Sequence, residues 1–377
     1  MKSLKKSTVK SSKKQTARKT KPENAPTNHP RYCALPKTPT RTFGPDVGPR
    51  RAEIILVSSD KWVNGTKLHY YFFKGDTDGS PNNWKGPKAH MDIVRNGFQK
   101  WKNLDIGLEF AEVDDINDAE VRIAFLRGDG SWSYVGREII DGNISENDPT
   151  MNFGWDISQD EDTVLHEIGH TLGFPHEHQN PFAGIVWNEE AVYAALAAPP
   201  NSWDRQKTFD NILKKLNKNK VTGSTHDPDS IMHYQFEAGL ILEPEKYRNG
   251  LFPAGGISAK DIEYVRGFYP KLTPKDYTNL TLGKSNSMNI EPGEQRNFKF
   301  KPKRSRSYTI QTIGEMDTVM VLFEKSNNEE IQIAGDDDSG TAANARIKMK
   351  LIKGREYIIR IRLFYKAANG ESAVIIV

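Results

Sequence analysis

The sequence predicts an α+β domain followed by an all-β domain. Up to Pro270, strand-like runs of branched and aromatic residues are interspersed with stretches of helical spacing. From about residue 276, short segments of alternating polarity are separated by turn residues, and no helical period competes with them. We therefore expect a disordered basic tail and linker over residues 1–45, a first domain over 46–275 and a second over 276–377.

In the first domain, branched and aromatic residues predict strands at residues 54–57, 68–73, 108–110 and 121–126. Asn64-Gly65 is a strong turn signal between the first two of these strands. One helix is predicted over 88–103, where apolar residues recur at helical spacing. A second is predicted over 162–172, because acidic residues from Asp160 onwards suit the positive end of a helix.

In the second domain, strands are predicted at residues 298–300, 308–310, 319–323, 347–349 and 357–361. Short alternating strands of this kind predict an antiparallel β-sandwich. Residues 336–340 read Asp-Asp-Asp-Ser-Gly, and carboxylates next to backbone oxygens are ligands that suit Ca²⁺. A plain acidic turn is the favoured interpretation of this stretch, and calcium is the alternative.

The charge of the chain is concentrated at one end. Residues 1–24 carry eight lysines and one arginine against Glu23 alone, so this stretch cannot bury enough apolar surface to fold. Such a tail can attract nucleic acid, but it has no interleaved aromatic residues for base stacking, which favours a solvated tail. No apolar run approaches twenty residues, so we expect no membrane span.

The stretch over residues 166–178, His-Glu-Ile-Gly-His-Thr-Leu-Gly-Phe-Pro-His-Glu-His, carries the strongest functional signal. On a helix, His166 and His170 project from one face and can converge on one cation. Gly173 accepts the left-handed backbone that ends a helix, so the chain can turn there and bring His176 in from a new direction.

Three neutral histidines suit Zn²⁺ and leave a fourth position for water, as a catalytic site requires. Glu167 lies between the first two histidines, beside that position, where a carboxylate can take a proton from water. This pattern predicts hydrolysis at a zinc site. The alternative is a histidine-rich helix end that binds nothing.

About sixty residues further on, residues 230–234 read Ser-Ile-Met-His-Tyr. With the long histidine motif, this stretch resembles the metzincin zinc endopeptidases, closest to the astacin-like branch. The resemblance implies a mixed sheet with a long active-site helix. It also implies that Met232 forms an apolar floor under the metal and that Tyr234 stabilises the tetrahedral intermediate.

The sequence departs from astacins in two ways. It has a single cysteine, where astacins carry cysteine pairs, and it lacks their Arg-x-Asp-Arg-Asp run after the third histidine. The stretches around Trp101 and at 257–262 resemble matrixins instead. The chain is thus expected to be a disulfide-free microbial or fungal relative.

The region after residue 276 resembles the bacterial pre-peptidase C-terminal domain, on Asp317, the aspartates of 336–338 and the run 354–357. Such domains accompany secreted proteases. The resemblances imply secretion, although no apolar core follows the basic residues as a signal peptide requires. Cytoplasmic location or non-classical export is the alternative.

Cys33 lies in Pro-Arg-Tyr-Cys-Ala-Leu-Pro, residues 30–36, which resembles the Pro-Arg-Cys-Gly-x-Pro latency segment of matrixin propeptides. The present stretch has an inserted tyrosine and lacks the glycine. A thiolate is a good zinc ligand, so a latency switch is chemically available. An incidental linker thiol is the favoured alternative, and the predicted metal ligands are the three histidines alone.

The expected function is therefore that of a zinc-dependent endopeptidase acting on proteins or peptides, with Glu167 activating zinc-bound water and Tyr234 assisting. Two alternatives come from other classes. One is an inactive adhesion module that uses the β-sandwich, and the other is a nucleic-acid-associated protein driven by the basic tail. Nothing in the sequence indicates an oligomeric state.

Overall fold

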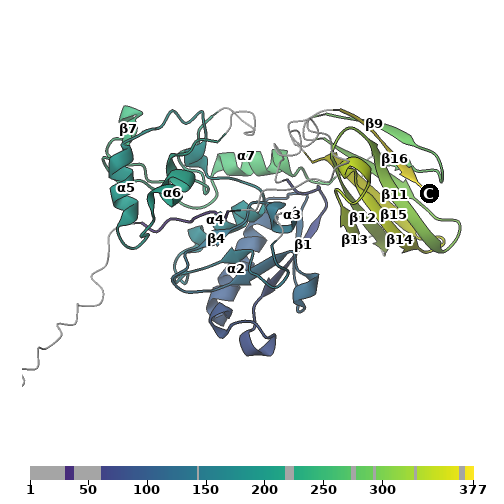
Figure 1. Ribbon diagram of the computed structural model, residues 1–377, viewed down its shortest axis with the longest axis horizontal. Helices are drawn as coiled ribbons and strands as arrows, with labels where there is room; N and C mark the ends of the chain where they lie inside the picture. Colours follow the sequence, from purple (N-terminus) through teal and green to yellow (C-terminus); the bar gives the residue numbers. More distant parts are fainter. Residues whose placement is uncertain are drawn as a thin grey trace, which may run out of the picture.

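The computed structural model describes residues 30–37, 61–141, 144–216, 225–272, 277–291, 294–326, 329–364 and 370–377. The strand predicted at 54–57 and most of the predicted tail lie outside these residues. Figure 1 shows a region of mixed helices and strands beside a separate C-terminal β-sandwich, which confirms the predicted fold class. Among the described helices, none combines the length and the apolar character needed to cross a membrane.

The first region is built on a five-stranded mixed sheet in the order β2-β1-β3-β5-β4. Its strands are β1 (Lys67–Phe72), β2 (Glu109–Glu112), β3 (Val121–Ala124), β4 (Trp132–Ser133) and β5 (Met151–Asn152). All neighbours pair in parallel except β4 and β5, which are antiparallel. The turn predicted at Asn64-Gly65 is present, with Gly65 at φ +96°.

Two helices cover the core of this sheet. Helix α2 (Lys88–Lys102) and helix α4 (Glu161–Thr171) form as predicted and pack against each other. Trp101 Nε1 of α2 donates a hydrogen bond of 3.1 Å to the backbone oxygen of Leu165 in α4. Apolar side chains of both helices enter the main core, so α4, which carries the histidine motif, is held on a rigid base.

A second lobe continues from α4 around its own apolar cluster, which includes Trp187 and Phe236. Its elements are β6 (Val186–Trp187), α5 (Glu189–Ala197), α6 (Arg205–Thr208), a π-helical turn (Phe209–Leu213), β7 (Ile241–Glu243) and α7 (Ala259–Phe268). The short helix α3 (Glu138–Asp141) precedes β5 in the first lobe. Single 3-10 turns occur at Gly75–Thr77, Asn82–Trp84, Ile116–Asp118, Glu177–Gln179, Glu245–Tyr247 and Thr341–Ala343.

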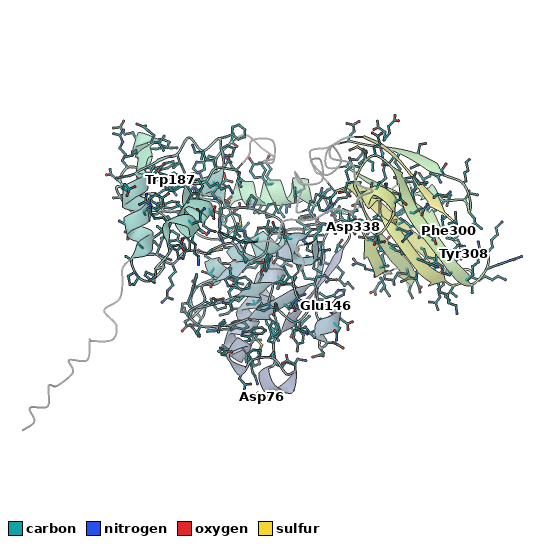
Figure 2. All side chains as sticks on the ribbon, in the orientation of Figure 1. Asp76, Glu146, Trp187, Phe300, Tyr308 and Asp338 are labelled. Carbon is teal, nitrogen blue, oxygen red and sulfur yellow. The ribbon has the colours of Figure 1, made fainter. Side chains whose placement is uncertain are left out.

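The C-terminal region is the predicted sandwich, with one sheet in the order β13-β12-β15-β10-β8 and another in the order β14-β11-β16-β9. Its strands are β8 (Thr278–Asn279), β9 (Asn286–Ile290), β10 (Gln295–Phe300), β11 (Arg306–Gly314), β12 (Thr318–Ser326), β13 (Glu329–Asp336), β14 (Arg346–Leu351), β15 (Glu356–Leu363) and β16 (Gly370–Ile376). Phe300 and Tyr308, labelled in Figure 2, pack edge to face between the sheets with ring centroids 5.4 Å apart.

The sandwich is fixed to the protease lobe by polar contacts. Arg137 Nη2 lies 2.9 Å from Asp337 Oδ2 in a largely buried ion pair. Gln295 Oε1 accepts a hydrogen bond of 2.8 Å from the backbone nitrogen of Asn64. Asp337 belongs to the acidic stretch at 336–340, and its neighbour Asp336 accepts from the backbone nitrogens of Ser339 and Arg346. This stretch therefore closes a turn and contacts the protease lobe.

Candidate metal centre and active site

Three imidazoles converge at the C-terminal end of α4. His166 and His170 lie one helical turn apart on α4, and His176 follows the helix. Nε2 of His170 lies 3.1 Å from Nε2 of His176. One ligand atom from each histidine and the Sγ of Cys33 all lie within 4.8 Å of one another.

The turn after α4 has the predicted geometry at Gly173. Its φ is +93°, in the left-handed region that favours glycine, and its nitrogen donates to the backbone oxygen of His170 at 2.7 Å. The nitrogen of Phe174 donates to the oxygen of Gly169 at 3.1 Å. These bonds close the helix, and His176 approaches from outside its axis.

The hydrogen bonds of two histidines set their tautomers. Nδ1 of His166 donates to the oxygen of Ile231 at 2.7 Å, and Nδ1 of His170 donates to the oxygen of Phe174 at 2.8 Å. A carbonyl only accepts, so each Nε2 carries a free lone pair directed at the centre. Nε2 of His166 is buried and has no hydrogen-bond partner among the described residues.

Electrostatics also suits a cation. Burial lowers the pKa of His166 to about 4 and lowers the pKa values of His170 and His176 well below the ordinary histidine value. All three rings are therefore neutral near pH 7, the form that binds metal. A nitrogen separation of 3.1 Å is close to the roughly 3.3 Å expected for two imidazoles on one tetrahedral zinc. The residues fit Zn²⁺.

Glu167 is fully buried beside this cluster. Its Oε1 has no hydrogen-bond partner among the described residues, and its Oε2 lies 3.6 Å from the Sγ of Cys33, which donates to it. Burial raises the pKa of Glu167 well above the ordinary value. A carboxylate in this state is able to accept a proton at neutral pH and to release it again.

Met232 lies beneath α4 and forces the identity of one helix residue. A Cβ built on Gly169 would lie 2.4 Å from the Sδ of Met232, so no larger side chain fits there without movement. Gly169 has no positive φ, and its role is the close approach alone. Sequence reasoning missed this residue, although a glycine inside a helix is itself a signal of close packing.

The turn that carries Met232 is tied to α7 by one carboxylate. Asp261 accepts from Ser230 Oγ at 2.6 Å and from the backbone nitrogen of Ile231 at 2.8 Å. Asp261 also forms a capping box with Ser258 at the start of α7. The sequence analysis did not assign this role to Asp261, and the Ser-x-x-Asp spacing was the available signal.

Tyr234 reaches the centre from the same turn. Its Oη lies 2.6 Å from Nε2 of His176, and it donates a hydrogen bond of 2.6 Å to the backbone oxygen of Cys33. Burial raises the pKa of Tyr234 well above its ordinary value, so the phenol stays protonated. The structure thus brings Tyr234 together with the histidines.

Cys33 is the principal difference from the sequence analysis, which left it out of the metal cluster. Its Sγ is buried and lies 3.5 Å from Nε2 of His170. Residues 30–37 were expected to belong to a disordered tail and linker, but they pack into the second lobe, because Tyr32 and Cys33 bury an aromatic ring and a thiol there.

The other histidines near the motif do not join the cluster. His178 and His233 are both buried, and Nε2 of His178 lies 2.8 Å from the oxygen of Asn211. Nδ1 of His233 donates to the backbone oxygen of Tyr234 at 2.6 Å. These contacts agree with supporting roles rather than metal ligation.

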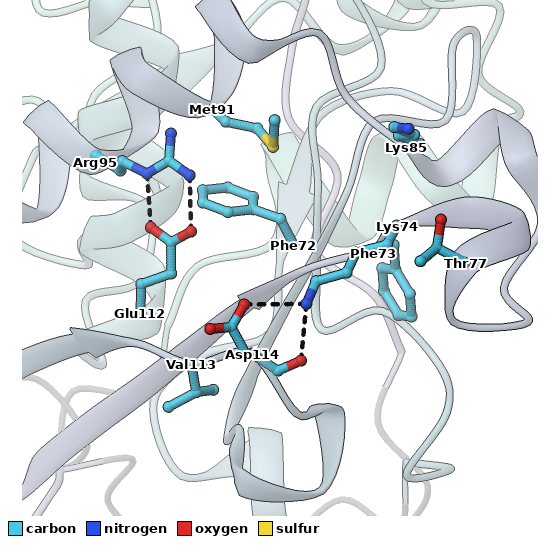
Figure 3. A pocket seen from close by; sticks show the side chains of 10 residues that line it. All are labelled: Phe72, Phe73, Lys74, Thr77, Lys85, Met91, Arg95, Glu112, Val113 and Asp114. Atoms are coloured by element: carbon cyan, nitrogen blue, oxygen red, sulfur yellow. Dashed lines mark hydrogen bonds and ion pairs between the residues drawn. The ribbon is translucent and has the colours of Figure 1, made fainter.

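A separate hollow lies where β1 ends near α2 (Figure 3). Arg95 pairs with Glu112 through two hydrogen bonds of 2.6 and 2.7 Å, and Lys74 pairs with Asp114 at 3.1 Å. These charges satisfy one another, and none of the lining residues belongs to the metal centre.

Comparisons with known proteins agree with this geometry. The model of the Astacin peptidase family matches residues 82–241. Zinc metalloproteinase nas-36 of Haemonchus contortus is 26% identical over 189 residues, which are 48% of this chain and 28% of that protein. The chain therefore spans less than a third of that relative.

Two solved structures are similar to different parts of the chain. Myroilysin is 30% identical, with a TM-score of 0.48, over 57% of this chain and 97% of the myroilysin chain. The pre-peptidase C-terminal domain of Bacillus anthracis collagenase is 14% identical, with a TM-score of 0.25, over 28% of this chain and 99% of that domain.

The fold and the site together define a zinc metalloendopeptidase, with a histidine helix, a third histidine after a glycine turn and a methionine turn beneath them. The chain belongs to the astacin family of peptidases.

Proposed function

We propose that this chain hydrolyses peptide bonds inside proteins and that residues 30–37 hold it in a latent state. The observation that supports this most directly is the convergence of three neutral imidazoles beside the buried carboxyl of Glu167. In this proposal, residues 46–275 form the protease domain and 276–377 an accessory β-sandwich. Zinc is the cofactor that the proposal requires.

The proposed roles follow from the contacts. His166, His170 and His176 would hold Zn²⁺ through their Nε2 atoms. Bound zinc would polarise the scissile carbonyl and lower the pKa of water at the open position. Glu167 accepts the proton of the attacking water and later delivers it to the leaving amine, which its raised pKa supports.

Tyr234 and Met232 have supporting roles. The phenol of Tyr234 donates a hydrogen bond to the negative charge that develops on the substrate carbonyl oxygen, as it now does to the backbone oxygen of Cys33. Met232 packs under α4 and keeps the two helix histidines in register.

Latency rests on the position of Cys33. Its thiol is within reach of the same centre as the histidines, and thiolate is a strong zinc ligand. A thiolate at the fourth position excludes water from it and leaves Glu167 without a proton donor to act on. Release of the segment would therefore activate the enzyme.

The test compares Cys33→Ser with the double variant Cys33→Ser, Glu167→Ala on casein, each with bound zinc measured by mass spectrometry. We expect equal zinc in both proteins, cleavage by the single variant only, and loss of that cleavage with a chelator. Glu109→Ala, on the exposed end of β2, serves as a matched control and should cut as the parent does. Cleavage by the Glu167→Ala protein would contradict the proposed mechanism.

We also infer that the enzyme acts outside the cell, because the resemblance to metzincins and to secreted accessory domains favours this location. Its test is the distribution of the protein between the culture medium and the cells of the native host. Protein found only in the cytoplasm would overturn this part of the proposal.

A further inference from the structure

Residues 30–37 occupy the place next to the metal centre where a substrate must pass. The backbone oxygen of Cys33 accepts from Tyr234 Oη at 2.6 Å, and the Cys33 thiol lies against His170. Tyr32 is therefore the neighbouring residue in a chain segment held at the reaction centre. Of the segment, only Tyr32 and Cys33 are buried.

The ring of Tyr32 fills an aromatic pocket. It stacks on Phe236 with centroids 5.8 Å apart and planes 24° apart. It also contacts Tyr234 at 5.0 Å and Trp203 at 6.3 Å, both in tilted arrangements. Only 6% of Tyr32 is exposed, so a flat ring of this size fits the space.

The far end of the pocket has a defined polarity. Oη of Tyr32 donates a hydrogen bond of 3.0 Å to the backbone oxygen of Gln235. Burial raises the pKa of this phenol, and the negative charge of Glu237 raises it further. An acceptor and a negative charge at this end favour a hydroxyl donor and disfavour an acidic side chain.

The remaining contacts of the segment use its backbone. Asn201 donates from Nδ2 to the oxygen of Pro30 at 2.9 Å and accepts from the nitrogen of Tyr32 at 3.0 Å. Oδ1 of Asn211 accepts from the nitrogen of Leu35 at 2.9 Å. Backbone contacts can be made by any sequence, so the choice of side chain depends on the Tyr32 pocket.

We propose that this pocket sets the specificity of the protease and selects polypeptides with an aromatic residue, tyrosine above all, beside the cleaved bond. The proposal rests on the proposed endopeptidase function, and it adds the class of substrate. The expected order of preference is tyrosine, phenylalanine, leucine, alanine and then aspartate, because the ring fills the pocket, the hydroxyl bonds to the Gln235 oxygen and a carboxylate meets Glu237.

The first test uses the full chain with Tyr32→Ala and Cys33→Ser, which loosens the segment and leaves the pocket free. Its substrates are synthetic decapeptides that differ at one central position, and mass spectrometry locates each cut. We expect cleavage beside tyrosine with kcat/KM at least tenfold above alanine and a hundredfold above aspartate. Glu237→Gln should narrow the gap between tyrosine and aspartate.

Cleavage of the peptides with less than a twofold preference would overturn the specificity proposal and leave the endopeptidase intact. Failure to cut casein or any peptide would instead contradict the proposed function. In that case the preference of the pocket is decided by a measurement that needs no turnover.

That second measurement is the rate at which the Cys33 thiol of the zinc-loaded full chain reacts with iodoacetamide. Tyr32→Phe should react within threefold of the wild type, and Tyr32→Asp at least twentyfold faster, because the segment leaves the pocket. Arg31→Ala, at an exposed neighbouring position, is the matched control and should leave the rate unchanged. Equal rates for all Tyr32 variants would overturn the proposed preference.

Discussion

The Sγ of Cys33 lies 3.5 Å from Nε2 of His170 and 3.6 Å from Oε2 of Glu167. One thiol thus contacts both a proposed zinc ligand and the proposed proton acceptor. Without a metal, burial and the nearby Glu167 raise the pKa of this thiol. A bound cation reverses that balance, because metal ligation deprotonates a thiol.

Replacement of Cys33 by serine should activate the zinc-loaded enzyme. A serine hydroxyl keeps the size of the side chain but is a poor zinc ligand, so water can enter the fourth position. We expect casein cleavage at least ten times faster than that of the intact wild-type chain. Equal rates for Cys33→Ser and wild type, at equal zinc content, would contradict the latency proposal.

Tyr234→Phe, made in the Cys33→Ser chain, should lower kcat with little change in KM. The phenylalanine ring preserves the contacts with His176 and His178, but the donor for the developing charge is lost. A single such donor contributes roughly 10²-fold or more to kcat in hydrolases. Steady-state kinetics on a casein-derived peptide measures both constants, and an unchanged kcat would remove Tyr234 from the mechanism.

The fold was predictable where local patterns are strong. Helices at 88–103 and 162–172 have clear periodicity or capping signals, and the structure has them at Lys88–Lys102 and Glu161–Thr171. Strand β13 was missed, because Glu329–Asp336 is an edge strand of mixed exposure without an alternating apolar face. Strand β16 was also absent from the prediction, although its burial alternates.

The site was predictable to a similar degree. The three histidines belong to one short motif, so their spacing alone implies convergence, whereas Cys33 lies more than a hundred residues away in sequence. Only the tertiary fold decides whether a distant thiol reaches the centre. Gly169 and Asp261 were missed for the same reason, since their partners Met232 and Ser230 lie on a remote turn.

Gly169→Ala should destabilise the protein and weaken zinc binding. The added Cβ would meet the Met232 Sδ at 2.4 Å, which forces the methionine turn away from α4. Overpacking of this kind costs about 1–3 kcal/mol. Gly267→Ala is a matched control, because Gly267 lies in helix α7 and a Cβ there meets nothing within 4 Å.

We therefore expect Gly267→Ala to be neutral or to stabilise the chain by about 0.5–1 kcal/mol through helix propensity. Urea unfolding and zinc titration of both variants make the comparison. A Gly169→Ala protein as stable as Gly267→Ala would show that the methionine turn is not held against the helix.

Glu177 gives the protein a pH-dependent stability that can be isolated with one substitution. Its Oε1 accepts from the nitrogen of Asp227 and from Asn180 Nδ2, each at 3.0 Å, and so joins the third-histidine loop to the segment before the methionine turn. Burial raises its pKa from 4.5 to about 7, against the opposing effect of these two hydrogen bonds. The folded state thus favours the protonated form more than the unfolded state does.

A raised carboxyl pKa contributes stability that is complete below pH 4.5 and is lost as the pH rises through about 7. Glutamine mimics the protonated form and does not titrate. The unfolding free energy of the wild type should therefore fall relative to Glu177→Gln between pH 5 and pH 8, by about 2 kcal/mol because partial exposure reduces the full effect. Urea unfolding of the two proteins at intervals across this range, with zinc removed from both, measures the difference. Parallel stability curves would mean that Glu177 titrates in the folded protein as it does in the unfolded chain, and that its burial has no electrostatic cost.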